Sequence, residues 1–227
     1  MKYRKRKRFM VKIQELYSLE HTLAKDYLLQ YEYPWQALKG IHELILQLID
    51  TLDEHYKQIS EGVYVHETAK IYPNAYLGSP CIIGPRTEVR PGAFIRQDAL
   101  VGADCVVGNS TELKNVILFD HVQVPHYNYV GDSILGYYAH MGAGSITSNV
   151  KSDQTLVVIQ DQDQRYETGR KKVGAMLGDH VEVGCNSVLN PGTVVGCDTN
   201  IYPLSSVRHV IPAHSIFKDQ NNIVHKK

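Results

Sequence analysis

Aliphatic residues recur at every sixth position between Val65 and Leu113. The row consists of Val65, Ile71, Leu77, Ile83, Val89, Ile95, Val101, Val107 and Leu113. A second row lies two positions earlier and holds the small residues Ala69, Ala75, Cys81, Thr87, Ala93, Ala99, Cys105 and Thr111. A helix has no such repeat, but a period of six equals three strand alternations, so every sixth residue points the same way. The pattern predicts short strands and tight corners that stack into a solenoid.

The same spacing returns near the C-terminus and is interrupted between the two runs. The later aliphatic row is Leu177, Val183, Leu189, Val195, Ile201 and Val207, with the smaller residues Ala175, Val181, Ser187, Thr193, Thr199 and Ser205 two positions before. Between the runs the inward row continues with steps of five and six, through Leu118, Val124, Val130, Leu135 and Met141. From Asn149 to Val173 the repeat stops, and we interpret this segment as an excursion, a hairpin arm, from one continuous solenoid.

The first 62 residues follow a different pattern, with few glycines and a helical spacing of apolar residues. Ile41, Leu44, Ile45, Leu48, Ile49 and Leu52 form one apolar stripe. This stripe predicts a helix, and Pro34 suits its first turn. An earlier helix is expected from about Leu19 to Gln30, with Ser18 as a candidate N-cap. Short helices need a partner surface, so we expect packing on the first coils or on another subunit, with Trp35 as an anchor.

These patterns divide the chain into three parts. Residues 1–62 are a basic tail and helical segment that serve capping or assembly, residues 63–217 are the solenoid with its excursion at 149–173, and residues 218–227 are a polar tail. The expected fold class is therefore mainly β, with an N-terminal helical segment.

Composition narrows the classes of function. The chain has 24 Lys and Arg residues and 24 Asp and Glu residues, so its balance argues against a surface built for nucleic acid. A basic run at residues 2–8 is interpreted as a solvated tail in preference to a nucleic-acid or membrane contact. No apolar run is long enough for a signal peptide or a membrane span, so we expect a cytoplasmic protein without a membrane partner. The four cysteines lack metal-ligand spacing and predict neither a zinc site nor a disulfide framework.

Four segments carry a more specific signal. They resemble the acetyltransferase domain of the bifunctional glucosamine-1-phosphate acetyltransferase/GlcNAc-1-phosphate uridyltransferase, and they occur in that family's order and close to its spacing. The segments are Ile83–Ala93, Val107–Val116, His126–Asp132 and Met141–Asn149. The resemblance covers about residues 63–217. It implies a left-handed parallel β-helix of hexapeptide repeats that forms a homotrimer, with acetyl-CoA and a sugar phosphate or nucleotide sugar bound between neighbouring subunits.

The resemblance also implies roles for individual residues. It makes His126 the general base, because an amino sugar must lose a proton to attack a thioester and a His titrates near neutrality. It implies that the acceptor is bound by Arg90, Lys114, Tyr129 and His140. It implies that acetyl-CoA is bound by Ala143, Asn149, Lys172 and Cys185. The backbone N–H groups of Gly142–Gly144 are expected to meet the thioester oxyanion. No metal is required for acetyl transfer.

The sequence departs from that family in several places. No Gly-rich nucleotide loop is present, so we expect no uridyl transfer from this chain. His140 stands where the family has an Asn, Cys185 stands where it has a Ser, and the residues after Phe217 do not match the family's tail. Three hypotheses follow: an acetyl-CoA-dependent N-acetyltransferase of an amino sugar, phosphorylated or nucleotide-linked as in UDP-N-acetylglucosamine synthesis; an enzyme with another acyl group or acceptor; and a non-catalytic module that binds sugar phosphates or sugar nucleotides.

Overall fold

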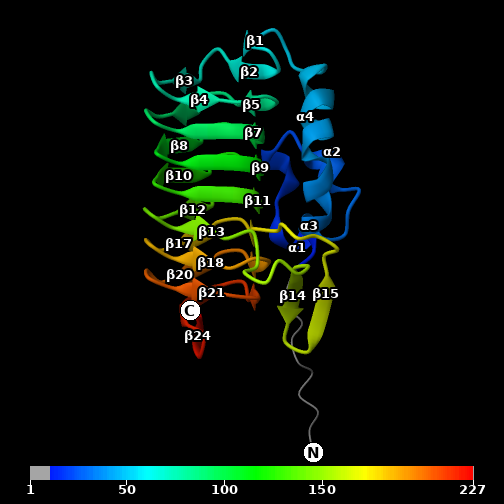
Figure 1. The fold of residues 1–227 in the computed structure, drawn as a ribbon, viewed down its shortest axis with the longest axis vertical. Coiled ribbons are helices and arrows are strands. Elements are labelled where there is room, and N and C mark those ends of the chain that lie inside the picture. The colour runs from blue at the N-terminus through cyan, green and yellow to red at the C-terminus, as the bar shows by residue number, and fades with distance from the viewer. Residues whose placement is uncertain (1–10, 227) are drawn as a thin grey trace, which may run out of the picture.

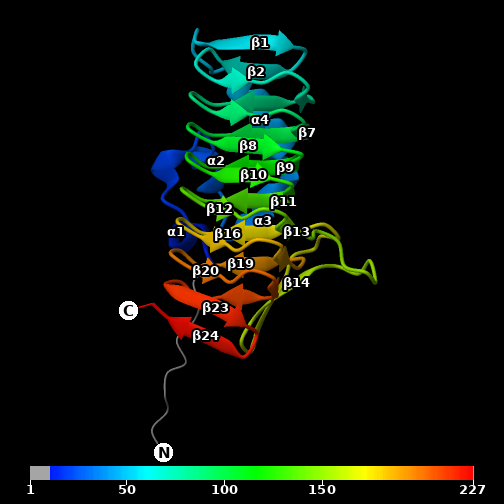
Figure 2. The same cartoon turned by 90° about the vertical axis from the view of Figure 1, so that its left-hand side faces the viewer.

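The structure is a computed structural model that describes residues 11–226. It confirms the predicted fold class: the chain is a left-handed parallel β-helix of about nine turns, with a short N-terminal helical segment along one side (Figure 1). Each full coil adds one strand to each of three faces, and the coils stack from the first at one end to the last at the other (Figure 2). The basic run at residues 2–8 lies outside the described residues.

Register assigns each strand of the solenoid coils to one face or to two adjoining faces. Face 1 holds β2 (Val63–His66), β5 (Cys81–Ile83), β16 (Ala175–Leu177), β19 (Thr193–Val195) and β22 (Val210–Ile211). Face 2 holds β3 (Lys70–Ile71), β6 (Glu88–Val89), β8 (Val106–Asn109), β10 (Gln123–His126), β12 (His140–Met141), β17 (Glu182–Val183), β20 (Asn200–Ile201) and β23 (Ser215–Asp219). Face 3 holds β4 (Tyr76–Leu77), β13 (Ile146–Thr147), β18 (Val188–Leu189) and β21 (Ser206–Val207). Three long strands, β7 (Phe94–Val101), β9 (Glu112–Leu118) and β11 (Tyr129–Leu135), begin on face 3 and end on face 1.

Antiparallel strands close both ends of the solenoid. At the first coil, β1 (Tyr56–Ser60) pairs with β2, and at the last, β24 (Asn222–His225) pairs with β23. Residues 218–227, predicted as a polar tail, thus include a strand. The two added strands cover edges that would otherwise offer unpaired backbone groups to another chain.

The repeated aliphatic row fills the solenoid, as predicted. Its members from Ile83 to Leu113, and those from Leu177 to Val207, are almost fully buried, while Ile71 and Leu77 of the first coil are partly buried. The small residues two positions earlier are buried beside them from Cys81 onward. The row therefore supplies the continuous apolar core that each coil needs and that no coil contains alone.

The steps of five residues have a local cause at one corner of the solenoid. Cys81 pairs with Ala99 eighteen residues on, but Ala99 pairs with Val116 only seventeen residues on. The shorter coils have one residue fewer at the corner between faces 3 and 1. The turn at this corner is made by Asp98, Asn115 and Asp132, with φ of 55°, 54° and 49°. Asp and Asn tolerate this left-handed conformation better than most residues. We call these three residues and their neighbours Lys114 and Asn149 the Asp132 corner.

The N-terminal segment is more broken than the sequence predicts. It consists of α1 (Ile13–Leu16), η1 (Leu19–His21), α2 (Lys25–Leu28), α3 (Pro34–Ala37), η2 (Leu38–Gly40) and α4 (Ile41–Ile49). The single helix expected from Leu19 to Gln30 is wrong, because Thr22 is extended, with φ −160° and ψ 145°. Ser18 makes no side-chain cap; its backbone N–H instead donates to Asp179 Oδ2 at 2.6 Å, which ties the segment to the solenoid.

The helical segment covers face 1. The predicted stripe of α4 is correct, since Ile41, Leu44 and Ile45 are buried against β5, β7 and β9. At the other end of the segment, the carbonyl of Leu16 accepts a hydrogen bond of 3.0 Å from the N–H of Asp179. The segment therefore runs lengthwise along several coils (Figure 1). None of its helices is long and apolar enough to cross a membrane, and neither is any other helix within residues 11–226.

The excursion is a hairpin arm, as predicted. Its strands are β14 (Val158–Asp161) and β15 (Gln164–Glu167), which pair antiparallel. The arm leaves the solenoid after β13 and returns before β16, and so starts and ends at the Asp132 corner. Tyr166 of the arm packs edge-on against Trp35, with ring centroids 5.6 Å apart, and Tyr33 stacks on the same indole at 4.8 Å. Trp35 is buried and is the predicted anchor, although its partner is the arm.

Candidate active site

His126 lies on the corner between faces 2 and 3, at the end of β10. Backbone hydrogen bonds connect successive coils there: Tyr127 N–H donates to Asn109 O at 2.9 Å, and Gly144 N–H donates to His126 O at 2.9 Å. Ala143 O and Cys185 O continue the series by accepting from Asn186 and Leu204. We call the residues Arg90, Asn109, His126, Ala143 and Cys185 the His126 corner. The His126 side chain is exposed and has no hydrogen-bond partner within residues 11–226.

A buried amide fixes the backbone around His126. Asn128 accepts from His126 N–H at 3.1 Å, and its Nδ2 donates to Gly142 O at 2.9 Å and to Ser145 O at 3.0 Å. Asn128 therefore joins the His126 turn to the Gly142–Gly144 bend of the next coil. The sequence motif contained this residue without revealing its role.

The expectation that all three N–H groups of the bend meet an oxyanion is wrong for two of them. Gly142 N–H donates to Val183 O at 2.7 Å, and Gly144 N–H donates to His126 O. Backbone donors that already serve stacking between coils are not free for a ligand. Among the described residues only the N–H of Ala143 in this bend lacks a partner, so it is the one donor left for a developing charge.

Two further predicted residues of this corner, Arg90 and Cys185, and the nearby His140 have polar or cavity neighbours. Arg90 Nε donates to Glu88 Oε2 at 3.1 Å, so this cation already has an acidic neighbour. His140 pairs through Nδ1 with Glu182 Oε2 at 2.7 Å on face 2. His140 and Cys185 line a shallow cavity of about 480 Å³ with Tyr202 and Ile216.

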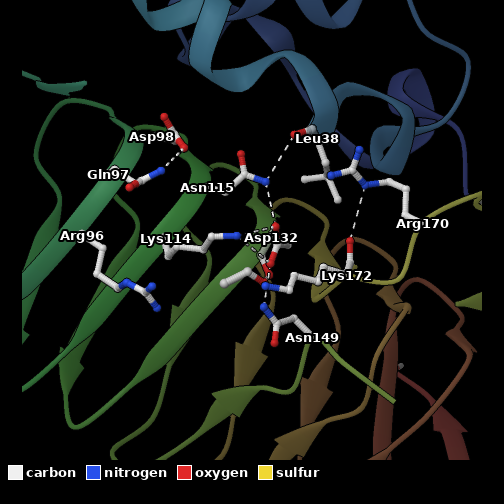
Figure 3. A network of polar contacts seen from close by, with 12 residues as sticks. Leu38, Arg96, Gln97, Asp98, Lys114, Asn115, Asp132, Asn149, Arg170 and Lys172 are labelled. Atoms are coloured by element: carbon white, nitrogen blue, oxygen red, sulfur yellow. Dashed lines mark hydrogen bonds and ion pairs between the residues drawn. The ribbon is translucent and has the colours of Figure 1, made fainter. Parts of the chain in front are cut away.

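The Asp132 corner is a buried polar network. The Asp132 side chain is 2% exposed, and Lys114 Nζ lies 3.1 Å from its Oδ1. Asn115 Nδ2 donates to Oδ1 at 2.8 Å, and Asn149 Nδ2 donates to Oδ2 at 2.6 Å (Figure 3). A buried carboxylate is tolerated because a cation and two amides satisfy it. Lys114 and Asn149, which the sequence assigns to different ligands, thus share one anchor.

Tyr129 joins the same network from face 3. Asn149 Nδ2 also donates to the Tyr129 hydroxyl at 3.2 Å. Burial, followed by the charges of Asp132 and Glu112, raises the pKa of Tyr129, which keeps the phenol neutral near pH 7. Gly131 makes the close approach possible, because a Cβ at that position would come within 2.5 Å of the Tyr129 hydroxyl oxygen.

The Asp132 corner opens into a cleft between the helical segment and the base of the arm. The cleft has a volume of about 520 Å³, and its walls are formed by residues that include Lys39, His42, Asp98, Lys114, Arg170 and Lys172. Figure 3 shows Arg170 beside Leu38 and Lys172 beside Asp132. His42 Nδ1 lies 2.7 Å from Asp98 Oδ1, so α4 is tied to the solenoid at this point. We call this space the helix–arm cleft; His126 lines neither it nor the cavity near Cys185.

The structure thus separates the predicted residues into two groups. Arg90, His126, Ala143 and Cys185 lie at one corner, while Lys114, Asn149 and Lys172 lie at another, with Tyr129 bonded to the second group. The helical residues Lys39 and His42 were missed, because nothing in a helical sequence marks which solenoid corner it will face. Asp132 and Asn128 stood within a quoted motif but carried no separate signal.

No cluster of three or more His, Cys, Asp or Glu side chains able to hold a metal ion occurs within residues 11–226. Beside their carboxylates, the two corners present cations, amides, one exposed imidazole and the backbone N–H of Ala143. This set suits an anionic ligand with hydroxyl groups.

Short parallel strands that stack coil on coil over three faces define the chain as a parallel β-helix. Residues 79–199, more than half of the chain, match the family model described as the GMPPB C-terminal domain. The chain belongs to that family.

Curated relatives agree with the predicted resemblance. The bifunctional sugar-1-phosphate nucleotidylyltransferase/acetyltransferase of Sulfurisphaera tokodaii is 28% identical over 90% of this chain and 54% of its own length. The bifunctional protein GlmU of Methanococcus maripaludis is 29% identical over 86% of this chain and 48% of its own length. The resemblance to bifunctional GlmU-type proteins is confirmed, and the chain spans about half the length of these relatives.

Among solved structures, a mutant of AntD, an N-acyltransferase from Bacillus cereus, in complex with dTDP-4-amino-4,6-dideoxyglucose and coenzyme A, is 15% identical. The match covers 76% of this chain and 91% of that chain, with a TM-score of 0.39. A TM-score this low supports no conclusion about function.

Proposed function

We propose that this protein is an acetyl-CoA-dependent N-acetyltransferase whose acceptor is an amino sugar that is phosphorylated or nucleotide-linked. The observation that carries this proposal is the folding of the His126–Asp132 motif across face 3. At one end of the motif stands an exposed imidazole, and at the other end a buried carboxylate holds Lys114 and Asn149. The S. tokodaii relative is named as a sugar-1-phosphate nucleotidylyltransferase and an acetyltransferase, which supports the same reaction class.

In the proposed reaction His126 is the general base. The amine nitrogen attacks the thioester carbonyl carbon, and its proton passes to the imidazole as the C–N bond forms. The oxyanion accepts a hydrogen bond from Ala143 N–H. The C–S bond then breaks, and the imidazolium returns the proton to the thiolate of coenzyme A. A base of this kind contributes about 10²–10⁴ in rate.

We propose a homotrimer in which each site lies between neighbouring subunits. Arg90, Lys114, Tyr129 and His140 surround the acceptor, while Ala143, Asn149, Lys172 and Cys185 surround acetyl-CoA. The division of these residues between two corners of one chain supports a shared site, because a neighbouring subunit brings a second set of corners against the first. Light scattering at the assay concentration tests the assembly, and a monomeric active protein contradicts it.

The experiment that tests the function is release of free thiol from acetyl-CoA in the presence of different amino sugars. The panel contains glucosamine, its 1-phosphate and UDP-glucosamine, each with and without EDTA. We expect thiol release that requires one acceptor and is unaffected by the chelator. Silence across the panel from a folded trimer contradicts the proposed acceptor class, and loss of activity in EDTA contradicts metal-independent transfer.

A second candidate function is a non-catalytic module that binds a sugar phosphate or sugar nucleotide. The observation that favours it is the absence of any side chain that orients the His126 imidazole within the described residues. General bases are commonly held by a second hydrogen bond. This reading predicts no affinity for acetyl-CoA, so saturable binding of acetyl-CoA in calorimetry excludes it.

A further inference from the structure

The helix–arm cleft carries more positive charge than its own acids can neutralise. Five Lys and Arg side chains and two carboxylates line it, a formal surplus of three positive charges. Lys39, Arg170, Lys171 and Lys172 have no carboxylate within ion-pair distance among residues 11–226. Cations gathered in a concave site without acidic partners favour an anionic ligand.

Both carboxylates of the cleft are already occupied. Asp98 Oδ1 lies 2.7 Å from His42 Nδ1, and Asp98 Oδ2 accepts from Gln97 Nε2 at 3.0 Å. Asp132 is satisfied by Lys114 and two amides. These acids therefore position His42 and Lys114, and they leave Lys39, Arg170 and Lys171 for a ligand of the groove.

The cleft continues into a second cavity along the arm. This cavity, of about 340 Å³, is lined by Tyr31, Trp35, Gln36 and Thr168, and it shares Lys39, Gly169 and Arg170 with the helix–arm cleft. The groove thus has an aromatic and amide end, a cationic centre at Lys39 and Arg170, and a polar end at Lys114. Each cavity alone has the volume of a small-molecule site, so the two together have room for more than a sugar monophosphate.

We propose that this groove binds the nucleoside diphosphate part of the acceptor, which makes the substrate an amino sugar linked to a nucleotide. The base stacks at Tyr31, the diphosphate lies between Lys39 and Arg170, and the sugar points to the Asp132 corner. The choice of a nucleotide-linked acceptor rests on the proposed function, whereas the diphosphate site rests on the groove alone.

The two central cations suit a diphosphate. Arg170 Nε donates to Lys172 O at 3.4 Å, which leaves the terminal nitrogens of the guanidinium for phosphate oxygens. Lys39 faces it from the helical segment, so the ligand bridges the helices and the arm. His42 has Nδ1 engaged by Asp98, and its other ring nitrogen remains for a ligand hydroxyl.

Calorimetric titration with nucleotides in the absence of acetyl-CoA tests the site. The probes are UDP, GDP and dTDP, each compared with its monophosphate and with coenzyme A. We expect at least one diphosphate to bind more tightly than its monophosphate. The substitution Arg170→Ala or Lys39→Ala is expected to lower the affinity for that diphosphate by about tenfold, the loss typical of one charge-assisted hydrogen bond.

Arg165→Ala is the matched control. Arg165 lies on the same arm, lies 3.8 Å from Glu167, and lines neither cavity. Its replacement is expected to leave nucleotide affinity unchanged. Thermal unfolding of each variant separates a lost contact from a lost fold.

The outcomes separate this inference from the proposed function. Diphosphate binding that depends on Arg170, in a protein that transfers no acetyl group, supports the groove and contradicts the enzyme. Acetyl transfer to a sugar 1-phosphate, with no diphosphate binding, overturns the inference and leaves the enzyme. The inference is wrong if Arg170→Ala and Arg165→Ala have the same affinity for the diphosphate. It is also wrong if Arg170→Ala lowers the affinity for coenzyme A alone.

Discussion

The two corners that border face 3 differ in how their polar groups are held. At the His126 corner the imidazole is exposed, and the N–H groups of Gly142 and Gly144 are used in stacking between coils. At the Asp132 corner the carboxylate is buried and bound by a cation and two amides. One corner therefore leaves its key side chain free to exchange protons, and the other fixes a charge permanently in place.

Under the proposed function, this difference is a division of labour between a base and a ligand-holding cation. A base must change its protonation state in each turnover, so exposure and the absence of a permanent partner suit it. A ligand-holding cation needs a fixed position, and Lys114 obtains one from Asp132. The arm and the helical segment both converge on the second corner, where their residues form walls of the helix–arm cleft (Figure 3).

The largest effect that separates the corners is expected for His126→Ala. We expect turnover to fall by about 10²–10⁴, because the proton acceptor is lost. The free energy of unfolding should change by less than about 0.5 kcal/mol, because the side chain is exposed. Thiol release measures the first quantity and urea unfolding the second. The control is His180→Ala, because His180 is exposed and lines none of the cavities described above. Equal losses of turnover in both variants would contradict a specific base.

At the opposite corner, Asp132→Ala should lower the stability of the fold. Removing the carboxylate leaves Lys114 and two amides without their acceptor in a site where Asp132 is 2% exposed. We expect a loss of about 3 kcal/mol in the free energy of unfolding, measured by urea titration at fixed protein concentration.

Asp104→Ala provides the comparison for that variant. Asp104 pairs with Arg86, whose side chain is 61% exposed, so solvent screens the pair and the loss should stay below about 1 kcal/mol. The Arg86 hydrogen bond lowers the pKa of Asp104, so its small contribution is present at neutral pH and is lost as pH falls through the folded pKa. Equal losses in the two variants would contradict a special role for the Asp132 network.

A smaller effect concerns thiol reactivity. Cys185 at the His126 corner is exposed, whereas burial raises the pKa of Cys81 to about 12 and that of Cys197 to about 11. The thiolate is the reactive form, so one thiol per chain should react rapidly with iodoacetamide at pH 8, and the others slowly or only after unfolding. Mass spectrometry of digested protein identifies the site. Protection of Cys185 by acetyl-CoA sharpens its assignment, and labelling unaffected by acetyl-CoA removes Cys185 from the donor site.

The sequence by itself determined the solenoid. The six-residue repeat predicts which side chains point inward, because every coil must fill the same interior space. Even the five-residue steps could be followed, and Leu118, Val130 and Leu135 are all fully buried as expected. The hairpin arm was predictable as well, from the loss of the beat between Asn149 and Val173.

The tertiary structure alone decided which groups meet at the Asp132 corner. Lys39 and His42 precede Lys114 and Asp132 by many residues, and Arg170 follows after an excursion, so no local pattern links them. Their meeting depends on which face the helices cover and on which corner the arm leaves. Helical periodicity specifies that a stripe is buried but not which surface it packs against. The sequence could therefore predict the buried stripe of α4 but not the helix–arm cleft.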